Sequence, residues 1–311
     1  MSATTTAEVP AARTTRARAL AVARWVAIVV VLGFAARQVA VHWPEFWGTI
    51  TAIAWQSSAL SLVALVAAIA VTTYGWQVLV DRLGPPVGYL RGAQICLVGQ
   101  LGKYVPGSVW AYLLQMELGR RAGLARARVF TGSLVQLGIG LVAALALSVL
   151  AVPEGGFGTW WPLALLPLGV AALHPRVLSW GTSLVLRLLR RPPLERPLGW
   201  TTIGRVFGAA LGAWTLQGVH LWLLVNAVGA PGVDGLVLCI GAMAVAMTAG
   251  TFAFLLPSGA GVRELVLVAL LAAGGIPTGQ ALAFALASRV MFTVADLLTA
   301  GGAAALSRAR H

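Results

Sequence analysis

The residues with the clearest chemical potential are cations embedded in apolar stretches. Lys103 and Arg263 each stand beside a proline-glycine break in such a stretch, and Arg289 lies within the last long apolar run. A charged side chain in a bilayer costs roughly 2.5–3.5 kcal/mol on insertion scales, so its presence there favours a function. Three cations indicate an anionic ligand. The alternatives are that Lys103 snorkels to the membrane surface and that Arg263 forms a structural ion pair with Glu264.

Two short turns could complete an anion site. Each turn, Pro106-Gly107-Ser108 and Pro257-Ser258-Gly259, precedes a short apolar segment that predicts a half-helix beginning at membrane depth. A helix N-terminus has free N–H groups and a positive dipole end, which together attract phosphate. Ser108 and Ser258 are placed to cap these half-helices. The predicted substrate-binding residues are Lys103, Pro106, Gly107, Ser108, Pro257, Ser258, Gly259, Arg263, Glu264 and Arg289.

No arrangement of residues predicts an enzyme. The four histidines are scattered, and no Ser-His-Asp order, carboxylate pair or Gly-rich phosphate loop is present. Cys96 and Cys239 lack metal-type spacing. His220, inside an apolar run, favours a hydrogen-bonded packing residue over a proton relay. We therefore expect no catalytic residue, no metal and no cofactor, and any transport must be downhill or ion-coupled.

The composition predicts a polytopic, α-helical membrane protein. Of the 311 residues, 59% are hydrophobic and only 10% are charged, whereas soluble domains carry about 25% charged residues. The net charge of +13 comes almost entirely from arginines that lie between apolar runs. This pattern fits the excess of basic residues in cytoplasmic loops better than it fits nucleic-acid binding.

The elements that must position these cations are membrane-spanning helices, which need about 20 apolar residues each. Six apolar runs are expected to span continuously, and two more are interrupted at the proline turns. The continuous runs are about 20–40, 57–79, 129–152, 160–173, 206–228 and 278–305, and the interrupted ones are 92–118 and 236–273. The spacing of Gly204, Gly208 and Gly212 predicts close approach of another helix. Residues 175–191 favour either an amphipathic surface helix or an extension of the preceding span.

The arginines predict the topology. If 92–118 enters and leaves the membrane on one side, its flanking arginines share a face with the basic segment 176–205 and with both termini. The resulting asymmetry marks the cytoplasmic face. We therefore expect both termini to be cytoplasmic, in a multi-pass protein of the cytoplasmic (inner) membrane. The stretch 92–118 then dips in from inside and 236–273 from outside, where protein or a wet cavity must surround the broken backbone.

The order span, re-entrant hairpin, span occurs twice, in about 57–152 and about 206–306. Because the hairpins are expected to enter from opposite sides, the copies are inverted repeats, an arrangement found in many secondary transporters. The predicted fold class is all-α, a polytopic membrane helical bundle with two inverted repeats, each containing a re-entrant helical hairpin. The predicted organisation is a cytoplasmic tail (1–18), a single transmembrane domain (19–306) and a C-terminal tail (307–311).

Two motifs resemble those of the flippase-like membrane family that includes the transmembrane region of lysylphosphatidylglycerol synthases. The first is Gly102-Lys103-Tyr104-Val105-Pro106-Gly107-Ser108-Val109-Trp110 with the following Gly119-Arg120-Arg121-Ala122-Gly123-Leu124. The second is Leu256-Pro257-Ser258-Gly259-Ala260-Gly261-Val262-Arg263-Glu264. The resemblance runs from about residue 20 to the end and implies a lipid-translocating domain. Gln136-Leu137 stand where the family often has a Glu-Arg pair, and no segment resembles the synthase's soluble aminoacyl-transfer domain, so the transferase activity is not carried over.

The leading functional hypothesis is a flippase or translocase for an anionic lipid, either an aminoacylated phospholipid or a polyprenyl-phosphate-linked intermediate. One alternative is a secondary transporter of a small anion that uses the same cavity. Another is a non-transporting membrane partner of a glycosyltransferase or lipid synthase, which predicts that Lys103 and Arg263 can be replaced without loss. An opening between spans that admits acyl chains would favour the lipid, and a closed polar tunnel would favour the small anion.

Overall fold

The structure is a computed structural model of the chain. It describes residues 36–105, 109–151, 161–188, 190, 197–229, 232–253 and 256–308, together with some positions between 22 and 34. Every regular element in these residues is a helix. In chain order they are α2 (Trp43–Ala52), α3 (Trp55–Arg82), α4 (Tyr89–Gln100), the 3-10 helix η1 (Leu101–Tyr104), α5 (Trp110–Arg121), α6 (Arg126–Ser148), η2 (Val149–Ala151), α7 (Trp161–Ala172), α8 (Pro175–Leu188), α9 (Trp200–Asn226), α10 (Gly232–Phe252), η4 (Pro257–Gly259), α11 (Val262–Ala273) and α12 (Thr278–Arg308).

Five helices in the described part of the chain are long and apolar enough to cross a membrane. They are Trp55–Arg82, Arg126–Ala151, Trp200–Asn226, Gly232–Phe252 and Thr278–Leu306. Four of them match runs predicted to be continuous. The fifth, α10, is the first arm of the stretch predicted to be interrupted, and at 21 residues it is longer than a half-helix. The run at 160–173 forms the 12-residue α7, and much of 20–40 lies outside the described residues.

Helices α4 and α5 fold back on each other. A Cβ added to Gly99 would lie 2.2 Å from the Gln115 side chain, and one added to Gly102 would lie 2.7 Å from the Ala111 backbone. The paired positions move in opposite directions along the chain, so the helices are antiparallel. Each has 12 residues, about 18 Å, which is short of the roughly 30 Å hydrocarbon core. The predicted interruption is confirmed, although Pro106, Gly107 and Ser108 themselves lie outside the described residues.

Helices α10 and α11 form a second antiparallel pair. A Cβ on Gly250 of α10 would lie 3.2 Å from the Arg263 Cβ of α11, and one on Gly274 would lie 2.3 Å from the Leu238 side chain. The turn between them needs glycine at position 259. There φ is +65°, and a Cβ would lie 2.5 Å from the Gly250 backbone. The break predicted at Pro257 is therefore present, between the end of α10 and the start of α11.

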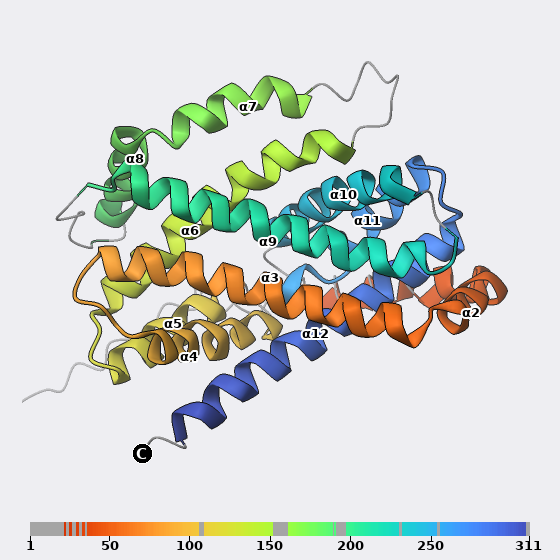
Figure 1. Cartoon of the computed structure of the whole chain (residues 1–311), viewed down its shortest axis with the longest axis horizontal. Coiled ribbons are helices and arrows are strands. Elements are labelled where there is room, and N and C mark those ends of the chain that lie inside the picture. Colours follow the sequence, from red (N-terminus) through yellow and green to blue (C-terminus); the bar gives the residue numbers. More distant parts are fainter. Residues whose placement is uncertain are drawn as a thin grey trace, which may run out of the picture.

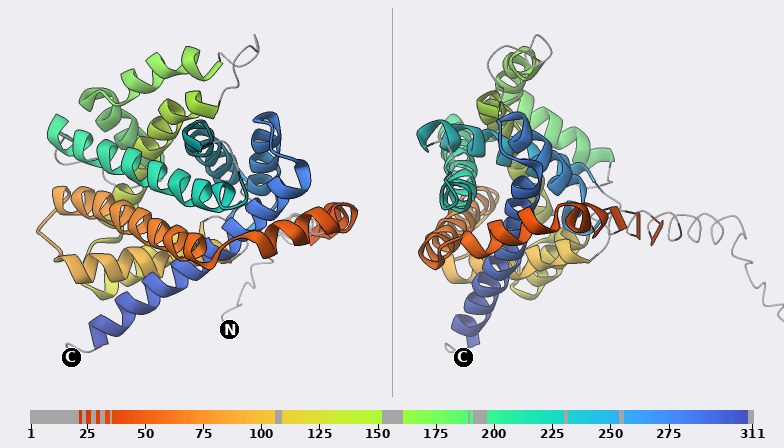
Figure 2. Two further views of the ribbon diagram at one scale, coloured as in Figure 1. Left: turned by 45° about the vertical axis from the view of Figure 1, so that its right-hand side comes forward. Right: turned by 90° about the vertical axis from the view of Figure 1, so that its right-hand side faces the viewer.

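The bundle is built around α3 and α9, which run side by side along most of their lengths (Figure 1). One buried cluster joins these two helices to the second pair and to α12 through Leu65, Leu224, Met243, Leu267 and Phe284. Helix α12 also packs against α2 and α4 and crosses the bundle obliquely (Figure 2). Because lipid is as apolar as these side chains, close packing rather than hydrophobic burial holds such helices together. The long α12 thereby contacts both antiparallel pairs.

The close approach predicted at Gly204, Gly208 and Gly212 is wrong. A Cβ added to Gly204 or Gly208 would meet no described atom within 4 Å, and at Gly212 the nearest is 3.8 Å away. Helix α9 instead approaches α10 at Gly218, where a Cβ would lie 2.4 Å from the Ile240 Cα. Glycine spacing alone did not identify the packed face, since glycine is frequent throughout membrane helices.

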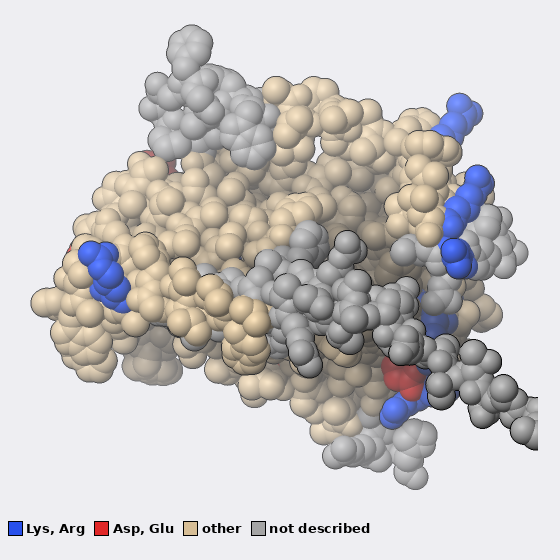
Figure 3. Space-filling model, turned by 180° about the vertical axis from the view of Figure 1, so that it is seen from behind, with Lys and Arg blue, Asp and Glu red and all other residues tan. Residues whose placement is uncertain are grey.

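Basic side chains gather at one end of the face drawn in Figure 3, and the described residues visible between the two ends are almost all uncharged. Helix α8 lies at the edge of the bundle and is separate from α7, which ends at Ala172 (Figure 1). Its exposed side carries an apolar stripe of Val177, Trp180, Leu184 and Leu188. These features favour the amphipathic surface helix over the extension of the preceding span.

Candidate functional site

A cavity of about 540 Å³ lies between the two antiparallel helix pairs. Its walls come from α3, from η1 and α5, from α6 and α9, and from α10, η4, α11 and α12. The charged residues that line it are Lys103, Arg263, Arg289 and Asp296, and the polar ones include Tyr104, Gln217, Thr248 and Ser258. The volume falls within the range of about 300–1,000 Å³ that is typical of ligand pockets.

The second turn positions the start of α11 at this cavity. Glu264 Oε2 accepts a hydrogen bond of 2.6 Å from the Gly261 backbone N–H, just before the first turn of α11. Gly261 is the N-cap of this helix, so the prediction that Ser258 caps it is wrong. Ser258 instead lies within the 3-10 turn at φ 52°, a left-handed conformation that is uncommon for serine. The carboxylate of Glu264 takes over the role of satisfying a free N–H group.

Two ion pairs link α12 to the two helix pairs. Arg289 Nη1 lies 2.7 Å from Glu264 Oε1, and Lys103 Nζ lies 2.6 Å from Asp296 Oδ2. The Tyr104 hydroxyl donates a 2.6 Å hydrogen bond to the same Asp296 oxygen. Lys103 therefore has a buried carboxylate partner, although its side chain stays 29% exposed. Asp296 is thus the residue through which α12 fixes the first turn.

Arg263 has no carboxylate within 4 Å in the described part of the chain, so the predicted alternative of an ion pair with Glu264 is wrong. The residue is only 4% exposed. Its Nη2 donates a hydrogen bond of 3.0 Å to Ser288 Oγ, and the guanidinium carbon lies 4.3 Å from the centroid of the Phe292 ring. Its Nε has no hydrogen-bond partner among the described residues. A buried cation with no described carboxylate at ion-pair distance is costly, which makes Arg263 a candidate for an anion-binding residue.

The cavity therefore carries an excess of positive charge. The cations Lys103, Arg263 and Arg289 outnumber the carboxylates Glu264 and Asp296 by one. Because the two carboxylates are already paired, the unbalanced charge resides on Arg263. A monoanion placed against Arg263 would neutralise the cavity, and a guanidinium can hold two phosphate oxygens at once.

Two further polar groups of the cavity lack partners. Gln217 Oε1 and Thr248 Oγ1 are buried and make no hydrogen bond with any described residue. Both residues line the cavity. Buried polar atoms are nearly always hydrogen-bonded, so these two groups are available to a ligand or to water. A ligand that carries both a phosphate and a hydroxyl or amine would satisfy them together with Arg263.

A chain of hydrogen bonds holds Arg263 from behind. His220 is fully buried, and its Nε2 lies 2.9 Å from Ser288 Oγ while its Nδ1 contacts Ser61 Oγ. A guanidinium can only donate, so Ser288 Oγ accepts the hydrogen bond from Arg263. The Ser288 hydroxyl is then assigned as the donor to His220 Nε2, which puts the ring hydrogen on Nδ1 toward Ser61. The predicted packing role of His220 agrees with these contacts, and the residue also orients the partner of Arg263.

The structure brings together five of the predicted site residues, Lys103, Ser258, Gly259, Arg263 and Arg289, around one cavity. Glu264 is paired behind them, and the Pro257 carbonyl lies 3.5 Å from Arg289 Nη2. Pro106, Gly107 and Ser108 lie outside the described residues. Five residues that line or support the site were not predicted as site residues, namely Tyr104, Gln217, Thr248, Ser288 and Asp296. Of these, only Asp296 gave a usable signal, a carboxylate within an apolar run and two helical turns from Arg289.

These features define the class of protein as a polytopic helical membrane protein with a cavity whose lining includes charged residues. A family model described as the lysylphosphatidylglycerol synthase TM region matches residues 18–299, and the chain belongs to that family. This confirms the resemblance inferred from the two motifs. No curated protein and no solved structure is detectably similar to the chain.

Proposed function

We propose that this protein translocates an anionic lipid across the cytoplasmic membrane. The observation that carries the proposal is the buried guanidinium of Arg263, which lines the cavity without a carboxylate partner among the described residues. A lipid phosphate would supply the missing negative charge. Membership of the lysylphosphatidylglycerol synthase transmembrane family supports a role that involves a lipid. The candidates are an aminoacylated phospholipid and a polyprenyl-phosphate-linked intermediate.

In this proposal the two antiparallel pairs are re-entrant hairpins in inverted repeats, and both termini are cytoplasmic. The shortness of α4, α5 and α11 supports re-entry, because none of the three can cross the hydrocarbon core alone. The gathering of basic side chains at one end supports the orientation, since that end would face the cytoplasm. Non-helical backbone at membrane depth would then lie against the cavity, where it is tolerated.

The proposed passage of the lipid uses the cavity for the headgroup and the bilayer for the acyl chains. Arg263 binds the phosphate, and Gln217 and Thr248 bind the polar groups attached to it. The N-terminal end of α11 lies beside Arg263 and adds its positive dipole end. Because Lys103 and Arg289 are each held by a carboxylate, their charges shape the cavity without holding the substrate too tightly.

The test is lipid movement in vesicles that contain the purified protein. Fluorescent phosphatidylglycerol, phosphatidylethanolamine and phosphatidylcholine are each placed in both leaflets, and the outer-leaflet dye is reduced chemically. We expect the protein to move phosphatidylglycerol faster than phosphatidylcholine. Uptake of radiolabelled phosphate or sulfate without lipid movement would instead indicate a small-anion transporter. If a correctly inserted protein moved neither lipid nor small anion, the remaining hypothesis would be a non-transporting partner of a glycosyltransferase or lipid synthase.

Variants of Arg263 sharpen this test. Arg263→Ala should slow lipid movement by roughly 10- to 100-fold, because a hydrogen bond to a charged group contributes roughly 1.5–3 kcal/mol. Arg263→Lys should keep part of the activity, since it retains the charge but loses the two-pronged geometry. Glu264 keeps its partner Arg289 in both variants, so its pairing is not disturbed. Arg205→Ala, at the exposed start of α9, is the control. Full activity of Arg263→Ala would contradict the proposal.

A further inference from the structure

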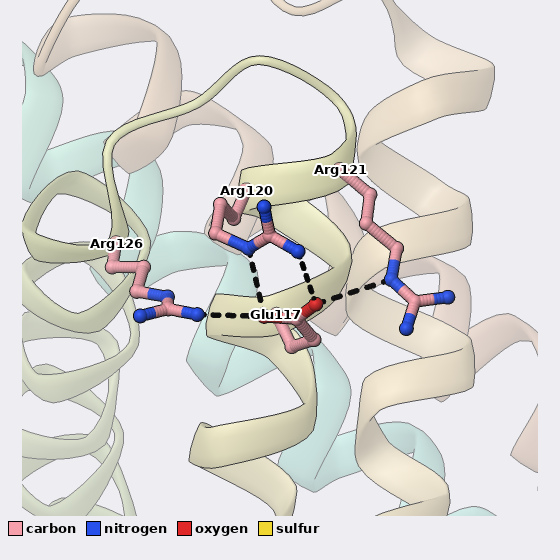
Figure 4. Close-up of polar contacts among 4 residues, drawn as sticks. All are labelled: Glu117, Arg120, Arg121 and Arg126. Carbon is pink, nitrogen blue, oxygen red and sulfur yellow. Dashed lines mark hydrogen bonds and ion pairs between the residues drawn. The ribbon is translucent and has the colours of Figure 1, made fainter.

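Three arginine side chains converge on Glu117 at the junction of α5 and α6 (Figure 4). Arg120 donates from Nε at 2.9 Å and from Nη2 at 2.7 Å, Arg121 from Nε at 3.2 Å, and Arg126 from Nη2 at 2.8 Å. Four such contacts use the acceptor directions of both carboxylate oxygens. They also hold the pKa of Glu117 well below its ordinary value, through the hydrogen bonds from Arg120, Arg126 and Arg121. The carboxylate therefore stays charged and fixes the three guanidiniums.

This Glu117 cluster has a net charge of +2, since three arginines surround one glutamate. Arg121 and Arg126 each use one nitrogen on Glu117, and their other guanidinium nitrogens point away from the carboxylate in Figure 4. Those nitrogens have no hydrogen-bond partner within the described residues. The two side chains are 71% and 52% exposed. Planar, outward-facing donors of this kind match the oxygens of a phosphate.

The exposed face of α5 changes character along its length. Trp110, Leu113, Glu117 and Arg120 follow one another at helical spacing on this face, with Trp110 and Leu113 almost half exposed. The rise from Trp110 to Arg120 is about 15 Å, which is close to half the thickness of a hydrocarbon core. The stripe thus changes from apolar to cationic over the distance at which a lipid changes from acyl chain to headgroup.

We propose that the Glu117 cluster binds the headgroup phosphate of an anionic lipid whose acyl chains lie along Trp110 and Leu113. The inference rests on the membrane placement of α5 that is part of the proposed function. It does not require that the protein transports the lipid. The opposite face of α5, with Ala111 and Gln115, lines the cavity. A lipid held at the cluster is therefore separated from the cavity by a single helix.

The test measures lipid binding to the detergent-solubilised protein by native mass spectrometry, with dioleoylphosphatidylglycerol and dioleoylphosphatidylcholine as ligands. The double variant Arg121→Gln/Arg126→Gln keeps the Glu117–Arg120 pair and removes the outward donors. We expect it to bind phosphatidylglycerol at least about tenfold more weakly, because charge-assisted hydrogen bonds are lost. The control is Arg187→Gln/Arg205→Gln, which removes the same charge from exposed positions on α8 and α9. It should change binding by less than about twofold, and phosphatidylcholine binding should change in neither variant.

Two results would overturn the inference. Equal loss of phosphatidylglycerol binding in both double variants would show that overall charge, rather than this cluster, attracts the lipid. Full displacement by glycerol phosphate at a matching concentration would show that the cluster binds free phosphates rather than a lipid. The two proposals fail separately. Binding that depends on Arg121 and Arg126 in a protein that moves no lipid would reject translocation and keep the lipid site.

Discussion

Arg263 is held by residues that do not line the cavity. Its guanidinium donates to Ser288, which donates to His220, and His220 in turn contacts Ser61. The four residues come from α11, α12, α9 and α3, so one hydrogen-bond chain ties Arg263 on α11 to three other helices. The hydrogen bonds along this chain run between buried groups on four helices, which limits how far the Arg263 Nη2 end of the guanidinium can move.

Removing the hydroxyl of Ser288 tests this chain. Ser288→Ala leaves Arg263 Nη2 and His220 Nε2 without their partner, which should cost about 1–3 kcal/mol of stability. Thr299→Ala is the control, because Thr299 lies on the same helix and its hydroxyl bonds only to carbonyls of that helix. It should cost less than about 0.5 kcal/mol. Thermal unfolding in detergent measures both. Equal stability of the two variants would mean that the chain does not hold Arg263.

Glu117 supplies a prediction about pH. Its folded-state pKa is lowered by the hydrogen bonds from Arg120, Arg126 and Arg121. A lowered carboxylate pKa contributes stability that is fully present above the unfolded pKa, about 4.3, and is lost as pH falls through the folded value. The difference in melting temperature between the wild type and Glu117→Gln should therefore be constant from neutral pH to about pH 5 and shrink only in stronger acid. A difference that already shrinks between pH 7 and 5 would contradict the charged cluster.

At the scale of helices, glycine positions separate packed faces from open ones. Gly218→Ala places a Cβ against the backbone of Ile240 and should destabilise the protein by about 1–3 kcal/mol. Gly208→Ala, on the same helix, meets no described atom within 4 Å and should be neutral or stabilising by up to about 1 kcal/mol, because alanine is the better helix former. Melting curves of both variants would check this. Greater damage from Gly208→Ala would mean that α9 packs through its other face.

The helices that the sequence predicted well are those with a long apolar run and no break. Runs such as 57–79 and 278–305 formed long helices, and the proline turns marked where α5 and α11 begin. Contacts between helices were harder to predict. No sequence pattern favours Gly218 over Gly204 as the packed position, because the packing depends on which residue of α10 lies opposite. Asp296 can be recognised in the sequence as a carboxylate within an apolar run. Its pairing with Lys103 could not be predicted, because it depends on how α12 crosses the first helix pair.

At the scale of the whole molecule, the charge distribution and the two antiparallel pairs bear on one question, which is how the chain crosses the membrane. Arg91 precedes most of α4 and Arg121 ends α5, so a re-entrant pair keeps both on one side, while a fully crossing segment separates them. Asp234 lies in the first turn of α10 and Thr278 begins α12, so these two positions test in the same way whether the second pair is re-entrant. All four residues are exposed, and the native Cys96 and Cys239 are buried, which keeps background labelling low.

Single cysteines at these four positions should therefore label in two pairs. We expect Arg91→Cys and Arg121→Cys to react with a membrane-impermeant maleimide only when the reagent is given access to the cytoplasmic side. Asp234→Cys and Thr278→Cys should react only from outside, because the proposed topology has three crossings between the two helix pairs. These are α6, the run at 160–173, of which the structure describes α7 (Trp161–Ala172), and α9. Labelling of Arg91→Cys and Arg121→Cys from opposite sides would show that the first pair crosses. In that case the inverted-repeat arrangement would fail, because Lys103 and Arg263 would not stand beside re-entrant turns that enter the membrane from opposite sides.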